Sequence, residues 1–222
     1  MRAVVFDFDG VLVDTEPLHY RSLRECLRPE GIAIDEEEYL REYLAYTDRE
    51  TVRIALERHG IAYDPALVEA VAARKARIFD AALDGISFFP GARELVQSLS
   101  AQVPLAIASG ALRGEIEAIL RAGDLREHFA SVVGAEDVTR CKPHPEPYLT
   151  AAARLGRLAE GLRPEDCLAF EDSVAGIDAA RAAGMKVVAV TNSYPRSKLA
   201  SAHRIVGSLA ELQLADLRTL FK

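Results

Sequence analysis

Six short runs of mostly apolar residues recur along the chain, and segments with helical spacing separate most of them. Because these runs are nearly uninterrupted rather than alternating, they are typical of strands buried on both faces of a parallel sheet. The predicted strands are Ala3–Phe6, Pro104–Ala108, Ser131–Val133, Cys167–Phe170, Lys186–Val190 and His203–Val206. The alternation of strands and helices predicts an α/β fold, with a doubly wound, Rossmann-like parallel sheet at its core.

One long stretch breaks this alternation. From about Thr15 to Gly85 the pattern is helical throughout, and breaks at residues 29–31, 45–48 and 60–65 divide it into four segments. We therefore predict an α/β core formed by residues 1–14 and 87–222, with an all-helical insert at residues 15–86. The helices predicted in the insert are Leu18–Leu27, Glu36–Leu44, Arg49–His59 and Pro65–Leu83. Those predicted in the core are Gly91–Ser100, Leu112–Ala122, Glu146–Leu155 and Val174–Ala183.

The balance of residue types narrows the class of partner. Half of the 222 residues are hydrophobic and 27% are charged, as in a globular protein. The formal net charge of −7 argues against nucleic acid as the main partner, because phosphate backbones select basic surfaces. The three cysteines are far apart and fit a reducing compartment rather than a disulfide framework or a zinc site. No run approaches the ~20 apolar residues of a membrane span. We expect a cytoplasmic monomer or weak dimer with no membrane partner.

The first predicted strand runs directly into a pair of acidic residues, Asp7 and Asp9. In an extended strand this spacing places both side chains on the same side, at the end of the strand where open α/β sheets build ligand sites. Gly10 then lets the chain turn sharply. Two close carboxylates repel, so they require a cation or a shared proton nearby. The alternative is a strand-end turn with solvated carboxylates.

Three more polar clusters follow predicted strands. Glu171 and Asp172 end the fourth strand and would meet the first acidic pair at one edge of the sheet, where carboxylate oxygens suit Mg²⁺. Ser109 and Gly110 end the second strand, and a hydroxyl with free amides before a helix forms a phosphate seat. Lys142 lies in a loop stiffened by prolines and supplies a compact positive charge. Taken singly, a capped turn, a Ser-Gly turn and an exposed loop lysine are the plain alternatives.

The four motifs together resemble the haloacid dehalogenase superfamily of phosphatases. They are the segment Asp7–Thr15, then Ser109, then Lys142 before a proline, and then Glu171 and Asp172. The resemblance covers nearly the whole chain. The helical insert is similar to the cap of the β-phosphoglucomutase and phosphoglycolate phosphatase branch. Dehalogenases of the superfamily lack the second aspartate of the first motif, so its presence here points to phosphoryl transfer.

The resemblance implies a role for each residue of the motifs. Asp7 is the expected nucleophile, which becomes an aspartyl-phosphate, and Asp9 is the expected general acid and base. Ser109, Lys142 and the amide of Gly110 are expected to hold the phosphoryl oxygens.

A magnesium site is implied as well. The expected ligands of Mg²⁺ are Asp7, the backbone carbonyl of Asp9, and Asp172, with Glu171 supporting the ion through its waters. Four basic residues are candidates for substrate binding: His19, Arg49, Lys75 and Arg113.

Three functions stay open within this resemblance. A phosphatase for a small phosphorylated metabolite, such as phosphoglycolate or a sugar phosphate, is favoured. The runner-up is a β-phosphoglucomutase, whose polar residues after the motif-two serine are replaced here by Gly110-Ala111-Leu112-Arg113. The helical insert also lacks that enzyme's Gly-Val-Ser-Arg loop pattern. The third is a non-catalytic protein that binds a phosphorylated ligand on the same fold.

Overall fold

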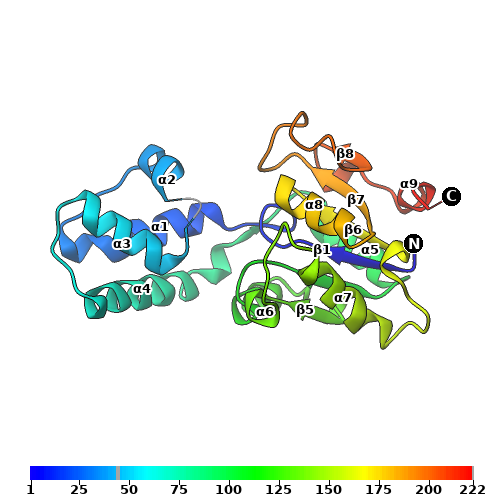
Figure 1. Ribbon diagram of the computed structural model, residues 1–222, viewed down its shortest axis with the longest axis horizontal. Helices are drawn as coiled ribbons and strands as arrows, with labels where there is room; N and C mark the ends of the chain where they lie inside the picture. The colour runs from blue at the N-terminus through cyan, green and yellow to red at the C-terminus, as the bar shows by residue number, and fades with distance from the viewer. Residues whose placement is uncertain (44–45, 222) are drawn as a thin grey trace. The chain divides into compact units, whose positions relative to one another are not determined.

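The computed structural model describes residues 1–43 and 46–221 of the chain. The chain forms two compact units, one made of Met1–Asp14 with Ser87–Lys222 and the other of Thr15–Ile86 (Figure 1). None of the helices described combines the length and the apolar character that crossing a bilayer requires.

The first unit is built on a sheet of six parallel strands in the order β5-β4-β1-β6-β7-β8. The strands are β1 (Ala3–Phe6), β4 (Leu105–Ala108), β5 (Ser131–Val133), β6 (Cys167–Glu171), β7 (Lys186–Val190) and β8 (Arg204–Val206). Each lies within one residue of its predicted bounds, and the predicted fold class is confirmed. The chain proceeds outward from β1 through β4 to β5, and then returns to the other side of β1 as β6. This reversal of strand order places the expected ligand site at the carboxyl end of β1.

Both faces of the sheet are buried, which explains why its strands are so uniformly apolar. Ala3 and Val5 of β1 belong to the core formed with α7 (Glu146–Gly156) and α8 (Val174–Ala182), which lie side by side against this face (Figure 1). Phe6 is also fully buried, and its ring stacks on that of Phe170 in β6 with the centroids 4.7 Å apart.

Two further helices of this unit follow the predictions, α5 (Ala92–Ser100) and α6 (Arg113–Ala122). Helix α9 (Leu214–Thr219) was not predicted, and neither was the antiparallel pair formed by β2 (Val13–Asp14) and β3 (Ser87–Phe88). The two strands of this pair are each two residues long, so neither shows a periodicity that a sequence pattern could reveal.

The second unit is helical, as predicted. Its helices are α1 (Glu16–Leu27), α2 (Glu36–Glu42), α3 (Asp48–Arg58) and α4 (Pro65–Asp80). The predicted end of the second helix, Leu44, lies outside the described residues. Asp35, Thr47 and Asp64 cap the N-termini of α2, α3 and α4, because each side chain accepts a hydrogen bond from a backbone N–H three residues later. Apolar side chains from α1, α3 and α4 form a separate core beneath them.

Candidate active site

The end of β1 places Asp7 beside the end of β6. The backbone N–H of Asp7 donates to the carbonyl of Phe170 at 2.9 Å, continuing the parallel pairing of the two strands. The carboxylates of Asp7, Glu171 and Asp172 are all buried, and each contributes an oxygen to a group whose members lie within 4.8 Å of one another. These three carboxylates therefore lie together at one edge of the sheet, as their positions at the ends of predicted strands indicated.

Lys142 reaches into this cluster from the loop before α7. Its Nζ lies 2.7 Å from Oδ1 of Asp7 and 2.7 Å from Oε1 of Glu171. The lysine is largely buried, with 15% of its side chain exposed. The interpretation of Lys142 as an exposed loop lysine is therefore wrong, since two carboxylates hold its ammonium group.

The charges within this cluster do not balance. When all three carboxyl groups are ionised, they face one ammonium group, which leaves an excess of two negative charges in a buried volume. Burial raises the pKa of Asp7 well above its usual range despite Lys142, and the neighbouring Glu171 and Asp172 raise it further. Burial likewise raises the pKa of Asp172 to about 6. A bound divalent cation would neutralise the two charges and reverse both shifts.

Lys142 and Glu171 stabilise one another's charged form. Burial favours the neutral form of each, but the charge of Lys142 and its hydrogen bond outweigh burial and lower the pKa of Glu171. Burial acts to lower the pKa of Lys142 in the same way. The negative charges of Asp7 and Glu171 outweigh this effect and raise the pKa of the lysine. Both groups therefore carry their charges at neutral pH.

The loop after β7 also contacts the acidic cluster, and its residues were not predicted from the sequence to belong to the site. Ser193 donates its hydroxyl to Oδ2 of Asp172, and Asn192 donates its side-chain amide to the carbonyl of Gly10 at 2.7 Å. A β-carbon on Gly10, whose φ is +74°, would overlap the carboxylate of Asp172. Polar residues directly after a buried strand were the available signal, the same one that identified Asp7 and Ser109.

The remaining core residues follow β1 and β4. Asp9 is half-buried and forms a β-bridge with Val13 just past the turn at Gly10. Ser109 is buried, and its hydroxyl accepts a hydrogen bond from the backbone N–H of Ala111 at 3.1 Å. Gly110 beside it is exposed.

Arg113 begins α6, and its guanidinium donates to Oδ1 of Asp137 at 2.6 Å. Its role in substrate binding stays a prediction.

Tyr148, in the first turns of α7, was also missed. It is fully buried, and its hydroxyl donates to Oε1 of Glu171 at 2.6 Å. A buried aromatic residue on the inner face of a helix is expected from the apolar spacing alone, and nothing local in the sequence indicates that its hydroxyl reaches Glu171.

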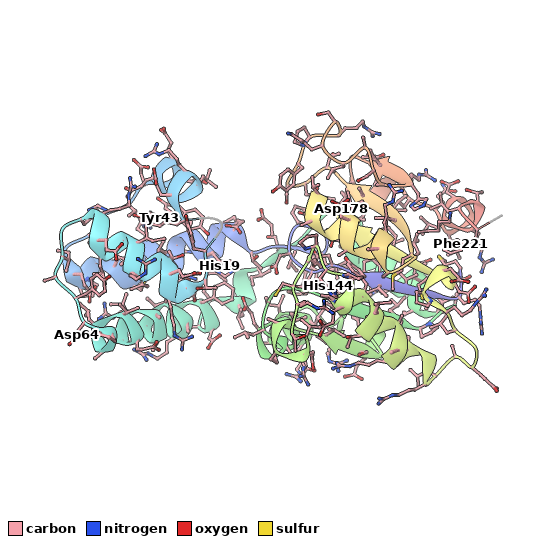
Figure 2. All side chains as sticks on the ribbon, in the orientation of Figure 1. His19, Tyr43, Asp64, His144, Asp178 and Phe221 are labelled. Atoms are coloured by element: carbon pink, nitrogen blue, oxygen red, sulfur yellow. The ribbon has the colours of Figure 1, made fainter. Side chains whose placement is uncertain are left out.

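The helical unit brings two of its three candidates together. Lys75 is buried, contacts Asp48 in an ion pair, and lies 3.2 Å from Nδ1 of His19 (Figure 2 labels His19). Because an ammonium group can only donate, Nδ1 of His19 is the acceptor. Burial and the adjacent Lys75 lower the pKa of His19 to about 4, so its ring is neutral at pH 7. Arg49 is exposed and pairs instead with Glu69 at 2.6 Å.

A small pocket of about 150 Å³ lies beside this pair within the helical unit. All of its lining residues carry a hydrogen-bonding group, and none is aliphatic. They are Glu16, His19, Tyr39, Tyr43, Tyr46, Thr47, Asp48, Thr51 and Lys75. With one cation, two carboxylates and a neutral histidine, the lining carries a slight excess of negative charge.

The chain is similar to known proteins over most of its length. The family model for haloacid dehalogenase-like hydrolases matches residues 4–190. A bifunctional riboflavin kinase/FMN phosphatase of Arabidopsis thaliana is 33% identical over 95% of the chain, which spans about half (54%) of that protein. Fructose-1-phosphate phosphatase YqaB of Escherichia coli (strain K12) is 35% identical over 84% of the chain and 95% of its own length. The crystal structure of a putative β-phosphoglucomutase from Thermotoga maritima matches with a TM-score of 0.81 and 30% identity, covering 99% of this chain and 100% of that one.

Proposed function

The chain belongs to the haloacid dehalogenase-like hydrolase family and is a phosphatase, and we propose that it uses Mg²⁺ to cleave a small phosphorylated carbohydrate. One observation carries the proposal: Asp7, at the end of the central strand, shares the ammonium group of Lys142 with Glu171. A buried carboxylate beside a fixed positive charge suits a nucleophile that must meet a phosphoryl group, whose negative oxygens need neutralising.

The acidic cluster fits a divalent cation in charge and in chemistry. Its excess of two negative charges is the amount that one Mg²⁺ neutralises, and hard carboxylate oxygens are the ligands that this ion prefers. Asp7, Asp172 and the backbone carbonyl of Asp9 would hold the ion, and Glu171 contributes to the charge of the cluster. When bound, Mg²⁺ would supply positive charge to the phosphoryl group.

The chain's own residues then divide the reaction into two steps. A carboxylate oxygen of Asp7 forms a bond to phosphorus while the bond from phosphorus to the alcohol oxygen breaks, and Asp9 gives its proton to that oxygen. In the second step Asp9 takes a proton from water, whose oxygen attacks phosphorus and releases phosphate from Asp7. Ser109, Lys142 and the amide of Gly110 hold the phosphoryl oxygens during both steps.

The polar pocket of the helical unit supports a carbohydrate as the alcohol part of the substrate. Hydroxyl groups need many hydrogen-bond partners, and every residue of the pocket offers one. The cation of Lys75 is already paired with Asp48, so the pocket has little to offer a second anionic group. A neutral sugar or polyol fits this balance better than the carboxylate of phosphoglycolate does. His19 and Lys75 are the substrate-binding residues that we propose there.

A β-phosphoglucomutase is the second candidate, favoured by the likeness to the putative enzyme of that name from Thermotoga maritima. A mutase must rebind a bisphosphate, so it requires cationic groups for a second phosphate. Arg113 and Lys75 are both engaged in ion pairs with Asp137 and Asp48, which favours the phosphatase. Conversion of β-glucose 1-phosphate to glucose 6-phosphate, primed by the bisphosphate, would reverse this order.

The test of the proposed function is release of phosphate from p-nitrophenyl phosphate. We expect activity with Mg²⁺, loss of activity with EDTA, and recovery when Mg²⁺ is restored. Asp7→Asn should lower kcat by at least about a thousandfold. Asp178→Asn is the matched control, because Asp178 lies on α8 with its side chain exposed (Figure 2). An inactive wild-type protein would contradict the phosphatase assignment, and an active Asp7→Asn variant would contradict the nucleophile. A panel of hexose phosphates and phosphoglycolate then tests the substrate class.

A further inference from the structure

Tyr148 contacts both partners of the ion pair that holds Lys142 in place. Its hydroxyl donates to Oε1 of Glu171 at 2.6 Å, and the Nζ of Lys142 lies 5.1 Å from the centroid of its ring. The same Oε1 atom accepts from Lys142 at 2.7 Å. Tyr148 is fully buried, so no solvent competes for its hydroxyl.

The carboxylate of Glu171 is saturated with hydrogen bonds from the protein. In addition to the two donors at Oε1, its Oε2 accepts from the backbone N–H groups of Asp172 at 3.1 Å and Ser173 at 3.2 Å, and from the hydroxyl of Ser173 at 3.0 Å. Five donors exceed the roughly four lone-pair sites of a carboxylate. Glu171 is fully buried as well, and the protein groups bonded to its carboxylate include the ammonium group of Lys142.

Lys142 is shared between two acceptors that compete for it. Its ammonium group has three N–H donors, and Asp7 and Glu171 accept two of them at equal distances of 2.7 Å. One donor is left for an oxygen of the phosphoryl group. The position of that donor depends on how evenly Lys142 is divided between Asp7 and Glu171.

We infer that Tyr148 is a positioning residue, which keeps Lys142 shared between Asp7 and Glu171 by donating its hydroxyl to Glu171. The hydrogen bond from Tyr148 takes up part of the negative charge at Oε1, so Glu171 attracts Lys142 less strongly. Without the hydroxyl, that oxygen has only Lys142 as its donor, and the ammonium group moves toward Glu171 and away from Asp7. The ring of Tyr148 limits this motion from a second side through its cation–π contact.

This inference rests on the proposed function, because Lys142 must serve a phosphoryl group for its position to affect the rate. A displacement of about 1 Å in a catalytic group lowers rates by up to ~100-fold. Tyr148→Phe keeps the ring and removes only the hydroxyl, so we expect kcat for p-nitrophenyl phosphate to fall by about tenfold. The KM and the dissociation constant for Mg²⁺ should each stay within about twofold of the wild-type values, because the hydroxyl that the substitution removes donates to Glu171 and not to the expected metal ligands Asp7 and Asp172.

The experiment compares the wild-type protein, Tyr148→Phe and Tyr63→Phe. Tyr63 also donates its hydroxyl to a glutamate, Glu57, but on the exposed surface of the helical unit, so its variant should keep the wild-type kcat. We would measure kcat and KM at saturating Mg²⁺, the dissociation constant of Mg²⁺ by calorimetric titration, and Tm. A fall in kcat without a change in KM or in the dissociation constant of Mg²⁺ supports the positioning role of the hydroxyl. A larger fall in Tyr148→Leu, which lacks the ring as well, supports a positioning role for the ring too.

Three results would overturn the inference. The first is a wild-type kcat in Tyr148→Phe. The second is a larger dissociation constant for Mg²⁺ together with recovery of kcat at higher Mg²⁺ concentration, which would assign Tyr148 to the metal site. The third is a loss of Tm large enough to leave the variant unfolded at the assay temperature, with wild-type kcat for its folded fraction. An inactive wild-type protein would instead contradict the proposed function, so the two failures are distinct.

Discussion

Gly176, in the first turn of α8, lies directly against the carboxylate of Glu171. A β-carbon at residue 176 would overlap the terminal carbon and both oxygens of that side chain. The backbone N–H of Gly176 also donates to the hydroxyl of Ser173 at 3.0 Å, and the same hydroxyl donates to Glu171. The first turn of α8 therefore packs tightly against Glu171, the residue that forms an ion pair with Lys142.

We expect Gly176→Ala to damage both activity and stability. The added methyl group must displace Glu171 or the backbone of α8, and overpacking of this kind costs about 1–3 kcal/mol of unfolding free energy. Displacement of Glu171 releases Lys142, so kcat should fall by more than tenfold. Urea unfolding and phosphate release from p-nitrophenyl phosphate measure the two effects.

Gly114→Ala is the matched control for this substitution. Gly114 lies in α6, and a β-carbon there would meet nothing within 4 Å. Alanine is the better helix former by about 1 kcal/mol, so the control should be neutral or slightly stabilising. A Gly176→Ala variant that behaves like the control would show that α8 adjusts without disturbing Glu171.

Most of the fold could be predicted because its signals are local. Four consecutive apolar residues predict a buried strand such as β1. The helical spacing of apolar residues and the serine cap predict α8. The pairing of β2 with β3 could not be predicted, because two-residue strands from opposite ends of a long insertion carry no periodicity. The order of the strands in the sheet could not be predicted either, because it depends on contacts between segments that are far apart in the sequence.

The candidate site divides in the same way. Asp7 and Asp172 follow buried strands, so the geometry of a parallel sheet places them at one edge, as predicted. Lys142 was found because prolines stiffen its loop. Tyr148 was not found, because its role depends on how α7 packs against β6, and a buried tyrosine on a helix otherwise indicates only core. Ser193 followed a strand and could have been found.

The stability of the helical unit should depend on His19 at mildly acidic pH. Burial and Lys75 lower the pKa of His19 to about 4 in the folded state, against 6.5 for the unperturbed side chain. The unfolded chain therefore binds more protons than the folded one between pH 6.5 and 4, so stability is lost as the pH falls through this window. The loss between pH 6.5 and 5 should reach about 2 kcal/mol.

Urea unfolding of the wild-type protein and of His19→Gln at pH 7.5 and pH 5 measures this effect. The decrease in unfolding free energy between the two pH values should be smaller in the variant by about the amount assigned to His19. Equal decreases in the two proteins would show that His19 does not take part in the acid sensitivity.

Lys75 should affect the choice of substrate rather than the chemistry. Lys75→Met removes the ammonium group and keeps most of the apolar stem in the core of the helical unit. Its partner Asp48 has 47% of its side chain exposed, so water can solvate the carboxylate that the substitution leaves behind. We expect kcat/KM for a hexose phosphate to fall by about tenfold, since a polar group of the pocket is lost. The value for p-nitrophenyl phosphate should stay within about twofold.

Arg53→Met controls for the loss of a cation, because Arg53 pairs with Glu57 on the surface of α3. It should leave both substrates unaffected. A Lys75→Met variant that loses activity toward both substrates equally would indicate general damage to the enzyme. One that loses neither would remove Lys75 from the substrate site.

Ser193 should tune the affinity of the acidic cluster for Mg²⁺. Its hydroxyl donates to Asp172, and this hydrogen bond orients the carboxylate and acts to lower its pKa, although burial prevails and the pKa is raised to about 6. Loss of a group that orients a metal ligand weakens metal binding by about 10–100-fold. We therefore expect Ser193→Ala to raise the dissociation constant of Mg²⁺ at least tenfold, while kcat at saturating Mg²⁺ is largely kept.

The pH dependence of this effect provides its sharpest check. Without the hydrogen bond from Ser193 the pKa of Asp172 rises, so protons compete with Mg²⁺ at higher pH than in the wild-type protein. The ratio of the two dissociation constants, measured by calorimetric titration, should therefore be larger at pH 6 than at pH 8. Ser201→Ala, in the same connection between β7 and β8, is the matched control and should bind Mg²⁺ as the wild-type protein does. If Ser193→Ala matched that control at both pH values, the hydroxyl would have no part in holding Asp172 for the ion.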